Sequence, residues 1–289
     1  MKLPLSRYCT DVRLPNIAII GTPRSGSSFL TKLLVANGWS IPYDNDRIAM
    51  KSYSFNPDGY FESTQINLLN DQLIRATHGL EYSFLNPPPI DSLNQEENFS
   101  YDLNEKTVEI PEDYLKNIFQ YTGQSWDVWG ITRMLPGEKW HEAYSRNNLA
   151  SRVGISESKE KVKNYLSQSS GLVVKDSRLT FTLGEFDNVF DKVIILTREE
   201  TGLVQSIRGH YGTRIFGGGG SFDKFDWVSN HFNYKLPGIS YKQFAERFED
   251  AYKQISHSYD YFKINQSDLN SQQEISRLSQ FLGFELKFN

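Results

Sequence analysis

Residues 21–30, which read GTPRSGSSFL, have the pattern of a loop that binds a phosphate group. An apolar, β-branched run at 16–21 predicts a strand before this loop, and TKLLVANG predicts a helix after it. A turn between a strand and a helix directs several backbone N–H groups and the positive end of the helix dipole toward one anion. Residues 12–43 contain three basic and no acidic side chains. This local charge favours an anion site over the alternative, a serine-rich turn whose hydroxyls only cap the helix.

The loop lacks the lysine that nucleotide kinases use. Gly21 and Gly26 have the spacing of the G-x-x-x-x-G-K-[ST] phosphate loop, but Ser27 stands where that motif needs lysine. Arg24 offers a cation from inside the loop instead. A kinase that uses ATP and magnesium is therefore an alternative that requires another cation in place of the missing lysine.

The segments that must position this loop alternate between strand and helix patterns. Short apolar runs predict buried parallel strands at 16–21, 171–176, 192–197 and 261–265. Helical patterns occur at 26–37, 62–77, 157–168, 199–209, 241–256 and 273–282. This alternation predicts an α/β fold, in which helices cover both faces of a central parallel sheet.

A long segment separates the first two predicted strands. It spans about 150 residues, far more than one crossover connection needs. We expect a single domain over 1–289, in which residues 80–165 form a capping insert that is mainly helical and recognises the substrate. Residues 91–142 hold 11 acidic and 4 basic side chains, which is consistent with either a solvated face or a recognition surface.

The phosphate loop resembles that of the sulfotransferase superfamily, whose motif is x-P-[KR]-[SA]-G-[ST]-[ST]. TPRSGSSF at 22–29 matches this motif across the whole loop. The resemblance implies a P-loop-like three-layer sandwich that binds 3′-phosphoadenosine 5′-phosphosulfate and releases adenosine 3′,5′-bisphosphate. It also implies that Phe29 lies against the adenine, the alternative for Phe29 being an ordinary core position. The residues implied around the phosphosulfate are Thr22, Pro23, Arg24, Ser25, Gly26, Ser27 and Ser28.

A second phosphate subsite is expected after the third predicted strand. Arg198 follows KVIILT, and Ser206 lies eight residues further on, about two helical turns along the next helix. VIILTREETGLVQSI resembles the segment in which the superfamily uses an arginine and a serine at this spacing. The resemblance implies that Arg198 and Ser206 bind the 3′-phosphate. Taken alone, Arg198 would favour a surface ion pair with Glu199 or Glu200.

Transfer of a sulfuryl group needs cations at the leaving phosphate. VVKDSRL at 173–179 resembles the K-D-P-R-L segment of bacterial sulfotransferases, with serine in place of the proline. Lys175 falls at the carboxyl end of a predicted strand, where ligands of open α/β sheets bind. We expect Lys175 and Arg24 to neutralise charge on the transferring group. We expect Asp176 and Arg178 to pair structurally, either with each other or with neighbouring residues.

The transfer also needs a base that removes the proton of the acceptor. NPDGYFESTQINLLND at 56–71 resembles the G-Y-[FW]-E segment of many bacterial sulfotransferases, which implies that Glu62 is the base. The alternative for Glu62 is an acid that complements the dipole of the following helix. His141, in KWHEAY, is the second candidate base.

The composition excludes several function classes. The chain has 289 residues, 38% apolar and 14% aromatic residues and a net charge of −4. These values are typical of a soluble globular protein and argue against a surface built wholly for nucleic acid or membranes. The single cysteine, Cys9, excludes an intrachain disulfide and a multi-cysteine metal cluster. We expect a cytoplasmic enzyme without a metal, a nucleic-acid partner or a membrane partner.

The expected acceptor is a small molecule. The resemblance to bacterial tailoring enzymes implies a secondary metabolite, such as a toxin precursor or a cationic alkaloid, that is sulfated on a hydroxyl or an amine. The acidic insert favours a neutral or cationic acceptor over a polyanionic glycan. Two alternatives remain: a small-molecule kinase that uses ATP with magnesium, and a catalytically inactive nucleotide-binding module of the same fold.

Overall fold

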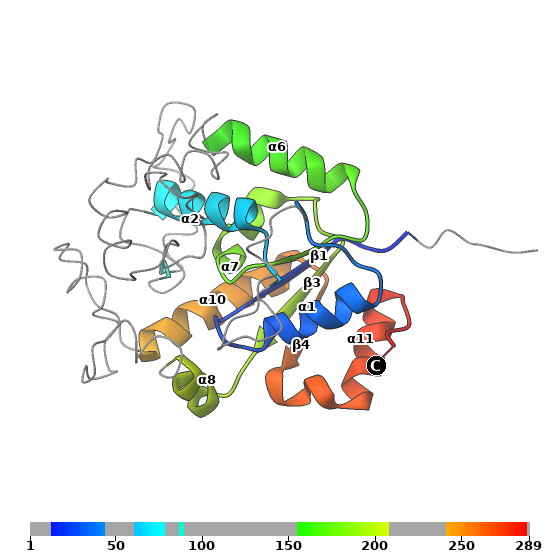
Figure 1. Cartoon of the computed structure of the whole chain (residues 1–289). Coiled ribbons are helices and arrows are strands. Elements are labelled where there is room, and N and C mark those ends of the chain that lie inside the picture. Colours follow the sequence, from blue (N-terminus) through cyan, green and yellow to red (C-terminus); the bar gives the residue numbers. More distant parts are fainter. Residues whose placement is uncertain (1–12, 44–60, 79–86, 90–154, 208–240, 288–289) are drawn as a thin grey trace, which may run out of the picture.

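The computed structural model describes residues 13–43, 61–78, 87–89, 155–207 and 241–287. Four parallel strands form one sheet in the order β2-β1-β3-β4 (Figure 1). Ile17 pairs with Val173 on one side and with Lys192 on the other, and Val193 pairs with Tyr261. The strands are β1 (Ile17–Gly21), β2 (Val173–Lys175), β3 (Lys192–Thr197) and β4 (Tyr261–Asn265). The prediction of a central parallel sheet is confirmed.

The helices that the sequence predicts are present within a few residues of the expected bounds. They are α1 (Ser27–Ala36), α2 (Thr64–His78), α6 (Ile155–Gln168), α8 (Glu200–Ile207), α10 (Tyr241–Ser258) and α11 (Gln272–Leu282). Three short helices had no counterpart in the sequence patterns: α7 (Leu179–Thr182), η2 (Leu183–Phe186) and η4 (Gln266–Asn270). Helices α7 and η2 lie between β2 and β3 in the chain, and η4 follows β4.

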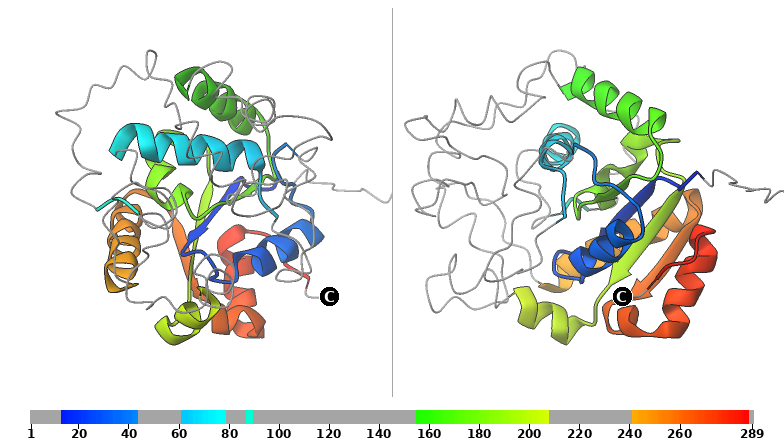
Figure 2. Two further views of the ribbon diagram at one scale, coloured as in Figure 1. Left: turned by 60° about the vertical axis from the view of Figure 1, so that its left-hand side comes forward. Right: turned by 45° about the vertical axis from the view of Figure 1, so that its right-hand side comes forward.

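Helices cover both faces of the sheet, which gives the predicted three layers. The side chains of β1 alternate between the faces: Ile17 and Ile19 pack with α1 and α11, and Ala18 and Ile20 pack on the opposite side. That opposite side is covered by α2, α6, α7 and α10. The views in Figures 1 and 2 show α2 and α6 on one side of the strands, and α1 with α11 on the other.

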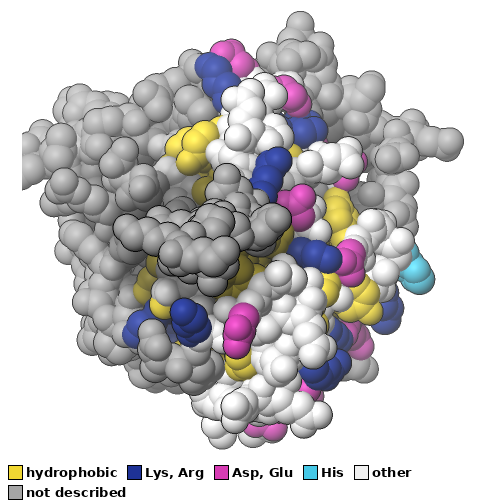
Figure 3. Space-filling view, turned by 90° about the vertical axis from the view of Figure 1, so that its right-hand side faces the viewer, with side chains coloured by type: hydrophobic (Ala, Val, Ile, Leu, Met, Phe, Trp, Pro, Cys, Tyr) yellow, Lys and Arg dark blue, Asp and Glu magenta, His cyan; other side chains and the backbone are white. Residues whose placement is uncertain are grey.

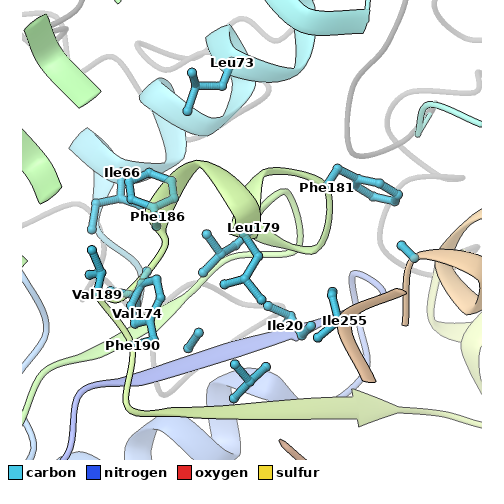
Figure 4. Close-up of a cluster of buried hydrophobic side chains, with 14 of the residues drawn as sticks. Ile20, Ile66, Leu73, Val174, Leu179, Phe181, Phe186, Val189, Phe190 and Ile255 are labelled. Carbon is cyan, nitrogen blue, oxygen red and sulfur yellow. The ribbon is translucent and has the colours of Figure 1, made fainter. Parts of the chain in front are cut away.

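Helix α2 is anchored in the core by one apolar face. Ile66, Leu69, Leu73 and Ile74 are 2% exposed or less, and burial of each such side chain stabilises the fold by about 1.5–3 kcal/mol. Figure 4 shows side chains of α2, α7 and β2 gathered in this cluster, among them Ile66. The residues just before α2 are therefore held at a defined place beside the sheet.

The start of α6 falls inside the predicted insert of residues 80–165. Ile155, Val162 and Leu166 of this helix are buried in the same core cluster as α2. The described end of the insert thus belongs to a helical layer of the sandwich. Residues 90–154, where a helical cap was expected, lie outside the described residues.

Charged side chains of both signs are intermingled on the face shown in Figure 3. Ion pairs within the described ranges include Arg277 with Glu274 at 2.7 Å and Lys159 with Glu185 at 2.8 Å. No helix in the described ranges is both long enough and apolar enough to cross a membrane.

Gly21 ends β1 at a place where a side chain does not fit. Its φ is +148°, and a Cβ atom there would lie 2.2 Å from the carbonyl oxygen of Leu196 in β3. We expect Gly21→Ala to lower the free energy of unfolding by about 2–3 kcal/mol, because the clash is with backbone of a central strand. Urea unfolding monitored by circular dichroism measures this change.

Gly184→Ala is the matched control for this substitution. A Cβ at Gly184 meets no atom within 4 Å, so its effect on the free energy of unfolding should stay within about 0.5 kcal/mol, as at other surface positions. Equal destabilisation by both variants would contradict the role assigned to the close approach of β1 and β3.

Candidate active site

The loop after β1 has the backbone form that the sequence predicts for an anion site. Arg24 and Gly26 both have left-handed φ angles, of 70° and 90°, and Gly26 is the residue that precedes the first turn of α1. The N–H groups of a first helical turn have no acceptor within the helix. Ser27 and Ser28, which begin α1, are partly exposed. Their N–H and hydroxyl groups are therefore suited to bind a phosphate oxygen.

The other hydroxyls of the loop face the interior. The Oγ1 of Thr22 and the Oγ of Ser25 are buried and have no hydrogen-bond partner among the described residues. Ser25 is fully buried, and its N–H donates to the carbonyl of Thr22 at 3.3 Å. Pro23 is buried as well. Of the hydroxyls implied by the loop motif, those of Ser27 and Ser28 are the accessible ones.

Phe29 does not occupy a core position. Its side chain is 42% exposed, which contradicts the alternative that Phe29 is an ordinary core residue of α1. A partly exposed ring beside a phosphate loop is suited to stack on a base. The contact with adenine stays a prediction.

Lys175 and Glu62 meet beside the phosphate loop, although 113 residues separate them. The Nζ of Lys175 pairs with Oε1 of Glu62 and donates to the Oγ of Ser28 at 3.4 Å. The side chain of Lys175 is 6% exposed and that of Glu62 is 24% exposed. A cation, a carboxylate and a hydroxyl thus converge where the first turn of α1 begins.

Glu62 is aimed at this point by the backbone before α2. Phe61 has a φ of 54°, which is unfavourable for a residue with a side chain, and it is buried with the α1 side of the core. Ile66, in α2, packs on the opposite side. Glu62 therefore lies where the chain passes from one layer to the other. It precedes the first turn of α2, and its Oε2 accepts a hydrogen bond from Asn67 Nδ2 at 2.8 Å.

Asp176 and Arg178 pair with each other, which is one of the two pairings expected from the sequence. Asp176 Oδ1 accepts from Nη1 and from the backbone N–H of Arg178, both at 3.0 Å. Its Oδ2 accepts from Asn70 Nδ2 at 3.0 Å. Burial raises the pKa of the Asp176 carboxyl, and the charge of Glu62 acts in the same direction, whereas Arg178 and Asn70 lower it. This buried group connects the end of β2 to α2 and α7.

Arg24 links the phosphate loop to the segment after β3. Its Nε donates to Ser206 Oγ in α8 at 3.3 Å, and its carbonyl accepts from Arg198 Nη1 at 3.0 Å. The described residues include no ion pair of Arg198 with Glu199 or Glu200, and the Nε of Arg198 is buried and has no hydrogen-bond partner among them. Arg198 and Ser206 are brought together through Arg24. The expected action of Arg24 together with Lys175 on the transferring group stays a prediction.

The two groups of residues lie on either side of β1. Lys175 ends β2 on one side, and Arg198 follows β3 on the other. The chain leaves β1 toward β2 and leaves β3 toward β4, so the connections diverge between β1 and β3. In open α/β sheets, ligands bind outside the carboxyl ends of the strands at such a point. Figure 1 shows α8 at this edge.

Some predicted features lie outside the described residues. These are the second candidate base His141, and most of the proposed capping insert. Within the described ranges there is no group of three or more His, Cys, Asp or Glu side chains arranged to hold a metal ion. The prediction that the reaction needs no metal is untested.

Asn67 and Asn70 were not predicted as site residues. Both are buried, at 4% and 0% exposure, and both contact predicted site residues or their neighbours. The available signal was the position of two amides, three residues apart, among the apolar residues of a predicted helix that begins beside Glu62.

Comparison with known proteins does not assign the chain to a family. No model of a known protein family and no curated protein matches the chain. One similar solved structure is that of deoxyadenosine kinase from M. mycoides with bound dCTP. The similarity has a TM-score of 0.31 and 12% sequence identity, and it covers 93% of this chain and 98% of that chain. A TM-score this low carries no argument about activity.

Proposed function

We propose that this chain is a sulfotransferase that moves the sulfuryl group of 3′-phosphoadenosine 5′-phosphosulfate to a small-molecule acceptor. The observation that carries the proposal is the presence of two cationic positions on opposite sides of one phosphate loop. Lys175 lies on the β2 side, and Arg24 with Arg198 lies on the β3 side. A donor with phosphates on both its 3′ and 5′ oxygens needs two such positions, since charge-assisted hydrogen bonds are the strong contacts to phosphate.

The chemistry belongs to the β2 side of the loop. The acceptor oxygen or nitrogen attacks the sulfur while the bond between sulfur and the 5′-phosphate oxygen breaks, and that bond's electron pair leaves on the phosphate. Glu62 takes the proton of the acceptor. Lys175 and the N–H groups at the start of α1 stabilise the charge that develops on the leaving phosphate. A sulfuryl group beside Ser28 competes with Glu62 for the ammonium group of Lys175. When Lys175 contacts the sulfuryl group, Oε1 of Glu62 can take the acceptor proton.

The β3 side of the loop holds the 3′-phosphate in this proposal. Arg198, Arg24 and Ser206 are already connected, so little side-chain freedom is lost when the phosphate binds. The buried Nε of Arg198 provides a further donor that has no partner in the described structure. The acceptor, which the resemblance implies to be a secondary metabolite with a hydroxyl or an amine, belongs to the same proposal.

A small-molecule kinase is the second candidate. The observation that favours it is the position of Lys175, whose Nζ lies 3.4 Å from Ser28 Oγ. This cation from β2 approaches the start of α1, where the lysine of a kinase phosphate loop would stand at Ser27. Such a kinase would use ATP and magnesium.

Donor turnover distinguishes these candidates. The full chain is incubated with 3′-phosphoadenosine 5′-phosphosulfate, a panel of phenols and amines, and a chelator, and release of adenosine 3′,5′-bisphosphate is measured by chromatography. Release under these conditions supports the sulfotransferase. Release of ADP from ATP with magnesium, and none from the sulfated donor, supports the kinase. Nucleotide binding without either release identifies an inactive module.

Replacement of Arg198 should reduce the preference for a 3′-phosphate. We expect Arg198→Ala to lower the ratio of affinities for adenosine 3′,5′-bisphosphate over adenosine 5′-monophosphate by about 10- to 100-fold, because a charged hydrogen bond contributes about 1.5–3 kcal/mol. Calorimetric titration measures both affinities. Arg277→Ala, which removes an exposed arginine of α11, should leave the ratio unchanged. An unchanged ratio of affinities in Arg198→Ala would contradict the assignment of Arg198 to the 3′-phosphate.

A further inference from the structure

Two buried asparagines of α2 stand between the core and the candidate active site. Asn67 and Asn70 are three residues apart and therefore lie on one face of the helix. They are 4% and 0% exposed. An amide in such a position must have its donors and acceptors satisfied, or the fold loses stability.

Asn67 is only half satisfied. Its Nδ2 donates to Glu62 Oε2 at 2.8 Å, whereas its Oδ1 is buried and has no hydrogen-bond partner among the described residues. The reverse orientation is unfavourable, because a carboxylate only accepts hydrogen bonds. The hydrogen bond to Glu62 therefore leaves the Oδ1 of Asn67 buried and unpaired, and such an unpaired acceptor lowers the stability of the fold. This combination indicates a role in the site, since an apolar side chain of the same size would suit the core better.

Asn70 connects the same helix to the end of β2. Its Nδ2 donates to Asp176 Oδ2 at 3.0 Å, and its Oδ1 accepts from Thr182 Oγ1 at 2.8 Å. Asp176 directly follows Lys175 in the sequence. Asn70 therefore fixes α2 relative to Lys175, and Asn67 fixes the carboxylate of Glu62 relative to α2.

We infer that Asn67 and Asn70 are positioning residues for the pair of Lys175 and Glu62. Asn67 donates a hydrogen bond to Oε2 of Glu62, so that Oε1 of Glu62 faces Lys175 and the start of α1. Asn70 sets the distance between the helix that follows Glu62 and the strand that ends in Lys175. The inference rests on the proposed function, because it assigns this geometry to the transfer step.

Asn67→Leu is the deciding variant. Leucine has the same branching and the same number of side-chain heavy atoms as asparagine and removes the unpaired acceptor, and Glu62 is exposed enough to be solvated. We expect an unchanged or raised midpoint of thermal unfolding. We also expect kcat for release of adenosine 3′,5′-bisphosphate to fall on the order of 100-fold, because a misplacement of the reacting groups by 1 Å has that effect. The KM for the donor should stay the same.

A spectroscopic measurement makes the test independent of turnover. Nitrogen-15 NMR of the lysine ammonium groups in the full chain without donor reports the contact of Lys175 with Glu62, and Lys175→Arg assigns the signal. We expect Asn67→Leu to shift or broaden this signal as Glu62→Gln does. Asn70→Ala should do the same and also lower the unfolding midpoint, since Asp176 and Thr182 lose a partner.

Asn16→Leu is the matched control. Asn16 is 3% exposed and donates from Nδ2 to the carbonyl of Leu166 at 2.9 Å, at the start of β1. Asn16→Leu should lower the midpoint of thermal unfolding and leave the NMR signal of Lys175 and kcat unchanged. An unaltered signal and kcat in Asn67→Leu would overturn the inference. A shifted signal in a chain that does not turn over the sulfated donor would keep the positioning role and reject the proposed function.

Discussion

Glu62→Gln is expected to lower kcat for transfer from 3′-phosphoadenosine 5′-phosphosulfate by about 10²- to 10⁴-fold, the contribution of a positioned general base. Glutamine keeps the length of the side chain but cannot take the acceptor proton. Glu62 lies outside the phosphate loop, so the affinity for adenosine 3′,5′-bisphosphate should change little. Rapid-quench kinetics and calorimetry measure the two effects separately.

Glu185→Gln is the control for this substitution. Glu185 in η2 forms an ion pair with Lys159 in α6 at 2.8 Å. Its side chain is partly buried, as is that of Glu62. Loss of that pair should leave kcat unchanged. If Glu62→Gln retained near wild-type activity, Glu62 would not be the base, and His141 would become the residue to replace.

Lys175→Met is expected to lower kcat by about 10²- to 10³-fold, the usual effect of removing one group that stabilises charge in a transition state. Methionine fills most of the space of the buried lysine stem. Glu62 remains partly exposed and hence solvated, so the free energy of unfolding should change much less than kcat. The affinity for adenosine 3′,5′-bisphosphate should fall by less than kcat, because part of the charge that Lys175 meets appears only during transfer.

Lys159→Met removes the lysine of the comparable ion pair with Glu185. It should leave both kcat and nucleotide affinity at the wild-type level. A loss of affinity with kcat unchanged in Lys175→Met would mean that Lys175 only binds the donor, which would contradict its place in the transfer step.

The sheet and its helices were predictable because their signals are local. Each strand is a short β-branched run, such as KVIILT before Arg198, and parallel strands buried on both faces require such runs. The loop after β1 was predictable for the same reason, since its glycine spacing and its serines are contiguous in the sequence. The pairing of Asp176 with Arg178, two residues apart, was predicted from neighbouring residues as well.

Contacts between distant segments were harder to predict. Lys175 and Glu62 were each assigned a role from their local motifs, but their ion pair depends on how α2 packs over β2. The bond from Arg24 to Ser206 depends on a left-handed backbone at Arg24, a conformation that non-glycine residues rarely adopt. Asn67 and Asn70 belong to no motif, and their partners are identified only in the structure.

The two cationic positions beside one phosphate loop are the basis of the proposed function, and calorimetry tests them most directly. Adenosine 3′,5′-bisphosphate and ATP are titrated into the full chain, each with and without magnesium. The proposal predicts binding of adenosine 3′,5′-bisphosphate that does not depend on magnesium and is tighter than that of ATP. Tighter binding of ATP in the presence of magnesium would contradict the proposal and favour the kinase.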